Sequence, residues 1–74
     1  MQKRSLSIAG HRTSLALEAE FWEGLETMAR SRNLQVSALV REIDENRQEP
    51  NLSSAVRLAV LRYYRGAMRS PEPQ

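Results

Sequence analysis

A short segment near the N-terminus carries the residues best suited to contact a ligand. Residues 11–17 read His-Arg-Thr-Ser-Leu-Ala-Leu, and in an extended strand one face of this segment presents Arg12, Ser14 and Ala16. The Arg12 guanidinium can fork onto a phosphate or onto O6 and N7 of guanine. A serine hydroxyl can donate or accept a hydrogen bond, and an alanine can touch only a thymine methyl. Such a face could contact nucleic acid, and the alternative is that Arg12 is an ordinary solvated strand residue.

Catalytic chemistry has no comparable set of residues. The chain has a single histidine, His11, and no cysteine, so the serine pair at residues 53–54 lacks a base. Thiolate and multi-histidine metal sites are excluded for the same reason. The acidic group at residues 42–45 follows an arginine and is typical of a solvated helix face. We therefore expect no enzyme, no metal site and no cofactor.

The charge of the chain is unevenly distributed. The net charge is only +2, but residues 1–17 carry +3, residues 18–49 carry −4 and residues 50–74 carry +3. A basic N-terminal segment beside an acidic middle suggests an anionic partner for the first 17 residues. Lys3 and Arg4 are expected to bind phosphate if DNA is that partner. The alternative is that they form a solvated basic start.

The spacing of apolar residues gives the elements that must position these side chains. Residues 1–10 form an arm in which Leu6 and Ile8 alternate with Ser5 and Ser7, a short strand-like pattern. These two apolar residues occupy even positions, whereas the larger apolar residues after Gly10 occupy odd positions. One regular strand with one buried face cannot do both, so we expect a bulge or break near Ala9-Gly10.

Three helices are predicted after the strand. Helical periodicity of apolar residues places them over residues 18–32, 36–47 and about 52–65. Asn33 is suited to the left-handed conformation at a helix end, and Gly66 is the expected stop of the third helix. Leu58 and Leu61 lie off the main apolar stripe of that helix, which predicts a structural helix with a second contact surface. Residues 67–74 are expected to be a disordered tail.

The strand needs a partner for its backbone donors and acceptors, and no second strand follows residue 17. We therefore expect it to pair with the same strand of a second chain, in an antiparallel ribbon that fits the major groove of DNA. A chain of 74 residues without cysteine also has a marginal core of its own, which favours an obligate dimer. The expected dimer core comprises Thr13, Leu15, Leu17, Phe21, Trp22, Leu25, Leu39, Val40 and Ile43.

At this point the residues resemble a family. Over residues 11–47 the sequence resembles a ribbon-helix-helix DNA-binding domain of the Arc and Met repressor superfamily. The resemblance lies in Arg-Thr-Ser-Leu-Ala-Leu-Glu, in the amphipathic helix through Met-Ala-Arg, and in Asn-Leu-Gln-Val-Ser-Ala-Leu-Val. Over residues 3–65 the sequence is similar to a bacterial subfamily with an added C-terminal helix. The segments that carry this similarity are Lys-Arg-Ser-Leu-Ser-Ile-Ala-Gly-His-Arg-Thr-Ser and the later Asn-Leu-Ser-Ser-Ala-Val-Arg. The resemblance implies a mostly α fold: one N-terminal strand that pairs with the partner chain's strand in an intertwined dimer, two helices, and a third C-terminal helix.

The resemblance also implies site residues. The positions that contact base edges in the family map to Arg12, Ser14 and Ala16. The N-terminus of the second helix holds a phosphate in the family, which maps to the amides of Val36 and Ser37. His11 is expected either to contact phosphate or to be a strand-end residue. The sequence departs from the family pattern at Gln35, where a serine or threonine cap is usual, and at Val36, where a basic residue often lies.

These inferences predict a DNA-binding domain over residues 11–66 behind a basic arm of residues 1–10. We expect a sequence-preferring transcriptional regulator in the bacterial cytoplasm, with no membrane segment, that binds double-stranded DNA as a homodimer or a dimer of dimers. The alternative is a protein-interaction dimer or an antitoxin that binds a protein through the acidic helices and the third helix. Only residues 70–74 are left over for a segment that folds on a toxin, which counts against the antitoxin role.

Overall fold

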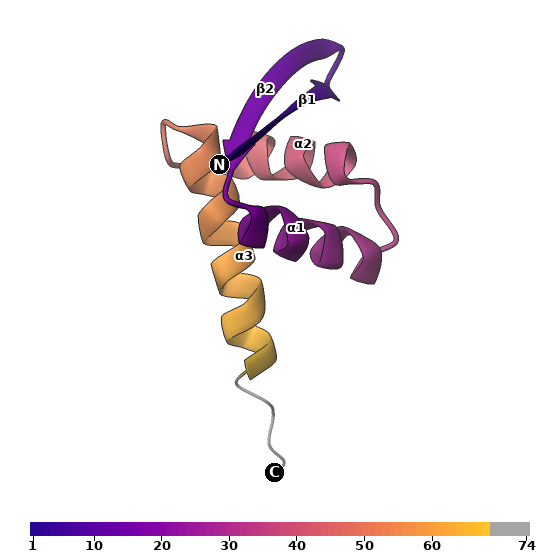
Figure 1. The fold of residues 1–74 in the computed structure, drawn as a ribbon. Coiled ribbons are helices and arrows are strands. Elements are labelled where there is room, and N and C mark those ends of the chain that lie inside the picture. Colours follow the sequence, from indigo (N-terminus) through magenta and orange to yellow (C-terminus); the bar gives the residue numbers. More distant parts are fainter. Residues whose placement is uncertain (69–74) are drawn as a thin grey trace.

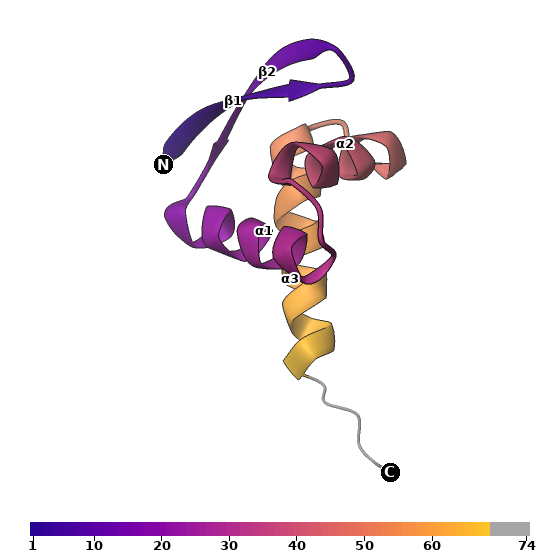
Figure 2. The same ribbon diagram turned by 90° about the vertical axis from the view of Figure 1, so that its right-hand side faces the viewer.

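Two strands and three helices follow one another in the computed structural model, which describes residues 1–68 (Figure 1). The elements are β1 (Gln2–Ile8), β2 (His11–Leu17), α1 (Ala19–Ser31), α2 (Val36–Asn46) and α3 (Leu52–Met68). The strands form a hairpin at one end of the molecule, α1 and α2 both lie on the same side of it, and α3 runs past both helices toward the opposite end (Figures 1 and 2). The expected order of a ribbon followed by three helices is confirmed.

The pairing of the ribbon differs from the expectation. β1 pairs with β2 of the same chain in an antiparallel register that runs from Gln2 opposite Leu17 to Ile8 opposite His11. The prediction that residues 11–17 lack a partner strand within their own chain is therefore wrong. The predicted break near Ala9-Gly10 is present, but it is a two-residue hairpin turn with φ of 53° at Ala9 and 84° at Gly10. Positive φ at both positions is the geometry that connects two twisted antiparallel strands, and it places the boundary predicted at residue 10 inside the hairpin.

The hairpin register explains why the apolar positions change parity after Gly10. Each residue lies opposite a residue of the other parity, as Leu6 opposite Thr13 and Arg4 opposite Leu15 show. Directly opposite residues in an antiparallel pair share a face of the sheet. The even positions of β1 therefore join the odd positions of β2 on one face, which packs on the helices and includes the buried Ile8, Leu15 and Leu17.

The core is completed within one chain. Six of the nine residues expected in a dimer core are buried without any second chain: Leu15, Leu17, Trp22, Leu25, Leu39 and Val40. The other three, Thr13, Phe21 and Ile43, are half-buried. Helix α3 covers these residues with Ala55, Val56 and Val60, all of which are buried. Helix α3 therefore packs as a structural element of the core, and its predicted second contact surface in a dimer or higher-order contact stays a prediction.

The helix ends follow local sequence with one exception. Asn33 has φ of 59° after α1, as expected of a residue at a helix end, and the Leu34 amide donates to the Ala29 carbonyl at 2.8 Å. The Asn51 side chain accepts a hydrogen bond from the Ser54 amide at 3.2 Å and so caps α3. The predicted stop at Gly66 is wrong, because α3 continues to Met68. A glycine costs a helix only about 1 kcal/mol relative to alanine, so its presence alone does not end one. The rest of the predicted tail, residues 69–74, lies outside the described residues.

Helix α1 approaches α3 closely at a buried glycine that the sequence did not single out. A Cβ at Gly24 would lie 2.7 Å from Val60 Cγ1 and 3.0 Å from Tyr64 Cε2. Gly24 therefore sets the distance between the two helices, because any larger residue would push Val60 or the Tyr64 ring away from α1.

An ion pair also fixes α3 to the junction between β2 and α1. Arg57 donates to both carboxylate oxygens of Glu18, at 2.9 and 3.1 Å. Its guanidinium also lies 5.9 Å from the centre of the Phe21 ring. The hydrogen bonds from Arg57 hold the pKa of Glu18 below its ordinary value of 4.5.

We expect Gly24→Ala to lower the free energy of unfolding by about 1–3 kcal/mol, because the added methyl overpacks the contact between α1 and α3. Gly66→Ala is the matched control, since a Cβ there meets nothing within 4 Å. That substitution should raise the free energy of unfolding by about 0.5–1 kcal/mol through helix propensity. Chemical denaturation measures both, and equal stabilisation by the two substitutions would show that α1 and α3 are not in close contact.

The ion pair of Glu18 predicts a pH dependence. Because the pKa of Glu18 is lowered in the folded chain, its contribution to stability is present above the ordinary value of 4.5 and is lost as the pH falls through the folded value. Glu18→Gln should therefore lower the melting temperature at neutral pH and have little effect well below pH 4.5. Glu20→Gln, an exposed neighbour, serves as the control. A loss of the same size at both pH values in Glu18→Gln would contradict the assignment.

Candidate nucleic-acid interface

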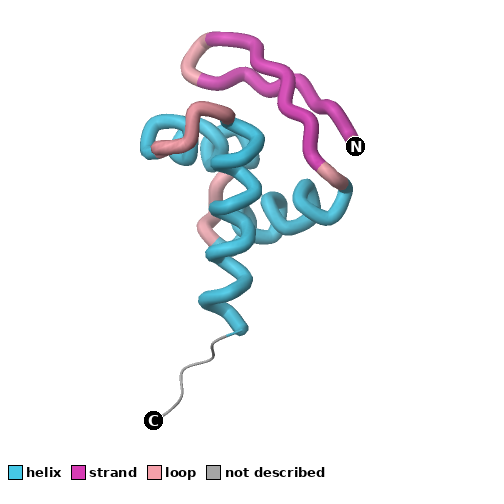
Figure 3. The backbone as a smooth tube through the Cα atoms, turned by 90° about the vertical axis from the view of Figure 1, so that its left-hand side faces the viewer, coloured by secondary structure: helices cyan, strands magenta, loops and turns pink. Residues whose placement is uncertain are grey.

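The outer face of the hairpin is the surface that points away from the helices. It is formed by three cross-strand pairs: Lys3 with Ala16, Ser5 with Ser14, and Ser7 with Arg12. All of these side chains are exposed except that of Ala16, which is half-buried. Figure 3 shows the hairpin as an outer layer over the helices, so that one side of the two-stranded sheet points away from them.

The composition of the outer face suits close contact with a polyanion. It contains two cations, three serines and one alanine, with no acidic residue and no large apolar residue. The structure therefore brings together the three predicted base-reading residues, Arg12, Ser14 and Ala16, and adds Lys3 to the same face. Ser5 and Ser7 were missed by sequence reasoning. Their alternation with apolar residues was visible, but their face could be assigned only once the hairpin register was known.

Arg4 lies on the opposite face of the hairpin from Lys3. Its guanidinium carbon is 4.3 Å from the centre of the Trp22 ring, and Nη1 donates to Glu26 Oε2 at 2.8 Å. The indole Nε1 of Trp22 donates to the Gln2 carbonyl at 2.9 Å. The structure thus separates two adjacent residues that were predicted to share a phosphate-binding role, because consecutive residues of a strand point to opposite faces.

The remaining predicted phosphate contacts lie away from the outer face. His11 is exposed at the end of β2 next to the turn, opposite Ile8. Val36 and Ser37 form the start of α2 and are half-buried. Gln35 has extended backbone angles at the N-cap of α2, and its side chain makes no capping hydrogen bond. The first amides of α2 therefore have no side-chain cap, which leaves them available to an anion.

Five ion pairs lie on the described surface, and none of them is on the outer face. Within residues 1–68 the pairs are Arg4 with Glu26, Arg32 with Glu42, Arg41 with Glu45, Arg47 with Asp44, and Arg57 with Glu18. Lys3 and Arg12 belong to none of these pairs. Arg32, at the end of α1, donates two hydrogen bonds to the Glu42 carboxylate on α2. This contact lowers the pKa of Glu42 and raises the pKa of Arg32, so the negative charge of Glu42 is partly neutralised.

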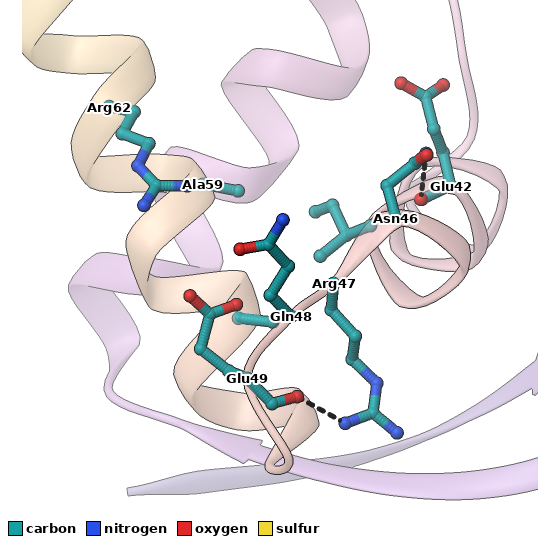
Figure 4. Close-up of a pocket in the computed structure, with 9 residues that line it drawn as sticks. Glu42, Asn46, Arg47, Gln48, Glu49, Ala59 and Arg62 are labelled. Carbon is teal, nitrogen blue, oxygen red and sulfur yellow. Dashed lines mark hydrogen bonds between the residues drawn. The ribbon is translucent and has the colours of Figure 1, made fainter.

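A shallow polar pocket lies elsewhere, between the end of α2, the following loop and α3 (Figure 4). Its volume is about 330 Å³, and its lining includes Asn46, Gln48, Glu49 and Arg62. The loop is held by a hydrogen bond of 2.7 Å from Arg47 Nη1 to the Glu49 carbonyl, drawn dashed in Figure 4. None of the predicted DNA contacts lines this pocket.

Three further observations limit what the described residues can do. Residues 1–68 contain no group of three acidic or histidine side chains arranged to hold a metal ion. No helix in that part of the chain has both the length and the apolar character needed to cross a membrane. Trp22 is only 1% exposed, so it packs in the core as predicted and offers no ring for a nucleic-acid base.

The fold and the hairpin can be compared with known proteins. A family model described as a ribbon-helix-helix domain matches residues 1–64. The chain belongs to the ribbon-helix-helix domain family. The match includes β1 and most of α3, and it confirms the family resemblance of the sequence. Ribbon-helix-helix domains commonly bind DNA in transcription regulators or antitoxins, and they typically form dimers.

A solved structure supports the same assignment. The chain is similar to an uncharacterized protein from Bordetella pertussis Tohama I, with 35% sequence identity and a TM-score of 0.76. The alignment covers 95% of this ribbon-helix-helix chain and 62% of the Bordetella protein. The chain therefore spans less than two thirds of the length of the Bordetella protein. No curated protein matches the sequence.

Proposed function

We propose that this ribbon-helix-helix protein is a sequence-preferring DNA-binding protein, a transcriptional regulator that inserts its two-stranded antiparallel ribbon into the major groove. The observation that carries the proposal is the outer face of the hairpin, which is exposed, free of acidic residues, and holds Arg12 and Lys3 outside every ion pair of the described residues. A two-stranded ribbon fits a major groove about 12 Å wide.

The arrangement of side chains on the ribbon gives each a distinct role. Lys3 and Arg12 lie at opposite ends of the face, because Arg12 is opposite Ser7 and Ser7 is four positions along β1 from Lys3. At about 3.3 Å per residue this separation is about 13 Å. The small side chains between them, including Ser14, let the strands approach the base edges. Arg12 is then the main base reader, Ser14 donates or accepts, Ala16 contacts a thymine methyl, and Lys3 contacts a phosphate.

The start of α2 supplies a second kind of contact in this proposal. The amides of Val36 and Ser37 lack a side-chain cap, and a helix N-terminus attracts a phosphate through its free N–H groups and its dipole. His11, at the turn of the hairpin, provides a further contact to the DNA backbone. Together these groups would fix the register of the ribbon on the duplex without contributing sequence information.

The proposed protein acts as a homodimer, or as a dimer of dimers, in the bacterial cytoplasm. Family membership supports dimerisation, since ribbon-helix-helix domains typically form dimers. Because most of the expected core is buried within one chain, this proposal lets the chains associate through surface elements. One such element is the outer side of α3, where Leu61 is 48% exposed. The same surface favours the alternative function, binding of another protein as an adaptor or an antitoxin.

The roles of Arg12 and Lys3 can be separated by their dependence on sequence and salt. Arg12→Ala should weaken binding to a preferred site by about 1–3 kcal/mol and relax the preference at one base pair. Lys3→Ala should weaken binding to all sequences alike and reduce the slope of log K against log salt by about one. Preferred sites come from selection on random duplexes, and fluorescence anisotropy over a salt series gives the affinities.

Arg30→Ala is the matched control, because Arg30 is an exposed arginine at the far end of α1. It removes the same charge from the chain but should leave both the affinity and the preference nearly unchanged. Equal losses in Arg12→Ala and Arg30→Ala would contradict the assignment of the outer face. Absence of binding to any duplex would favour the protein-interaction alternative.

A further inference from the structure

We propose that Arg4 is a positioning residue, which clamps the free end of the hairpin to α1 and thereby holds the outer face in the orientation that DNA requires. The clamp consists of three side chains, Arg4 from β1 and Trp22 and Glu26 from α1. Its effect on DNA binding rests on the proposed function, whereas its effect on the hairpin does not.

The clamp joins β1 to α1, two elements whose backbones pack mainly against other elements. The backbone of β1 packs against β2 and α2, and β2 packs against α1 and α3. Arg4 reaches from β1 to α1, where its guanidinium covers the Trp22 ring at 4.3 Å and donates to Glu26 at 2.8 Å. Trp22 and Glu26 are four residues apart and so lie on one side of α1. A planar guanidinium can stack on a ring and bind a carboxylate at the same time, which an ammonium group does less well.

The clamp holds the open end of the hairpin, which lies opposite the turn. The turn joins the strands at the other end of the hairpin, and a two-stranded sheet is only marginally stable on its own. The hydrogen bond from Trp22 Nε1 to the Gln2 carbonyl holds the backbone at this end, and the Arg4 side chain covers the indole that makes it. Lys3 lies between these two attached residues and points to the opposite face. Fixing Gln2 and Arg4 on the inner face therefore fixes Lys3 on the outer face.

The position of Arg4 separates positioning from direct contact with DNA. Arg4 lies on the opposite face from Lys3 and Arg12, so contact with DNA held on the outer face would require its guanidinium to leave Trp22 and Glu26 and uncover the indole. A positioning residue stays in the clamp when DNA binds. Loss of the clamp then lowers affinity because the free end of β1 must be ordered on binding, but it leaves the number of phosphate contacts, and hence the salt slope, unchanged.

Adjacent residues on opposite faces provide the test, with Lys3→Ala as the matched control for Arg4→Ala. In the full chain, Arg4→Ala should speed hydrogen exchange of the β1 amides and red-shift the Trp22 emission. It should weaken binding to a preferred duplex by about five- to tenfold, the size expected of one exposed cation–π contact and one surface ion pair together. The salt slope should keep its wild-type value. Lys3→Ala should leave exchange and emission unchanged and lower the slope by about one.

Two further variants locate the effect in the clamp. Arg4→Lys should restore part of the affinity and of the exchange protection, because it keeps the charge next to Glu26 but loses the planar stacking. Glu26→Gln should weaken binding less than Arg4→Ala does. The double variant of Arg4→Ala and Glu26→Gln should be no weaker than Arg4→Ala alone, since both remove the same contact.

Two results would overturn the proposal. One is a salt slope lowered by about one in Arg4→Ala, together with a change of Trp22 emission when wild-type protein binds DNA, which would make Arg4 a phosphate ligand. The other is unchanged exchange of β1 and unchanged affinity in Arg4→Ala. If the wild-type protein binds no duplex, the proposed function fails, and the exchange and emission measurements still decide whether Arg4 clamps the hairpin.

Discussion

The turn at Ala9 and Gly10 is the constraint on which the rest of the structure depends. Both residues adopt positive φ, which lets β1 fold back on β2 with two residues between them and fixes which side chains lie opposite each other. Glycine takes this conformation freely, whereas alanine is strained in it, so the packing of the strands must hold Ala9 in place. A shift of the register by one residue would turn Lys3 toward the helices and Arg4 toward solvent.

The third helix adds apolar residues to the core of the single chain. A chain of this size is marginal alone, and a partner chain was the expected remedy. Instead Val56 and Val60 cover residues from the hairpin and from both preceding helices, and Gly24 lets α3 come close enough to do so. The outer face of the hairpin contributes no residue to this core. Its cations and small polar side chains support the proposed contact with DNA.

Much of the fold could be predicted because it depends on local patterns. Helical periodicity located α1 and α2, Asn33 marked the end of α1, and strand alternation assigned Arg12 to the exposed face. The hairpin was missed because the strand-like alternation at Leu6 and Ile8 was attributed to an arm, and the change of parity was attributed to a bulge. The face of Arg4 depends on that register, so it could not be assigned without it. The extension of α3 past Gly66 was missed because a glycine can end a helix or continue one, and the residues around it do not distinguish the two.

The most direct test of the hairpin is a disulfide between Ser5 and Ser14. These residues lie opposite each other, and such pairs have Cα atoms about 4.5–5.5 Å apart, within the range that a disulfide spans. The chain has no cysteine of its own, so Ser5→Cys with Ser14→Cys introduces the only two thiols. After oxidation, a denaturing gel without reductant should show a monomer with an internal disulfide at every protein concentration. A covalent dimer joined through these two positions, with no internal disulfide, would mean that the strands pair between chains and would contradict the account.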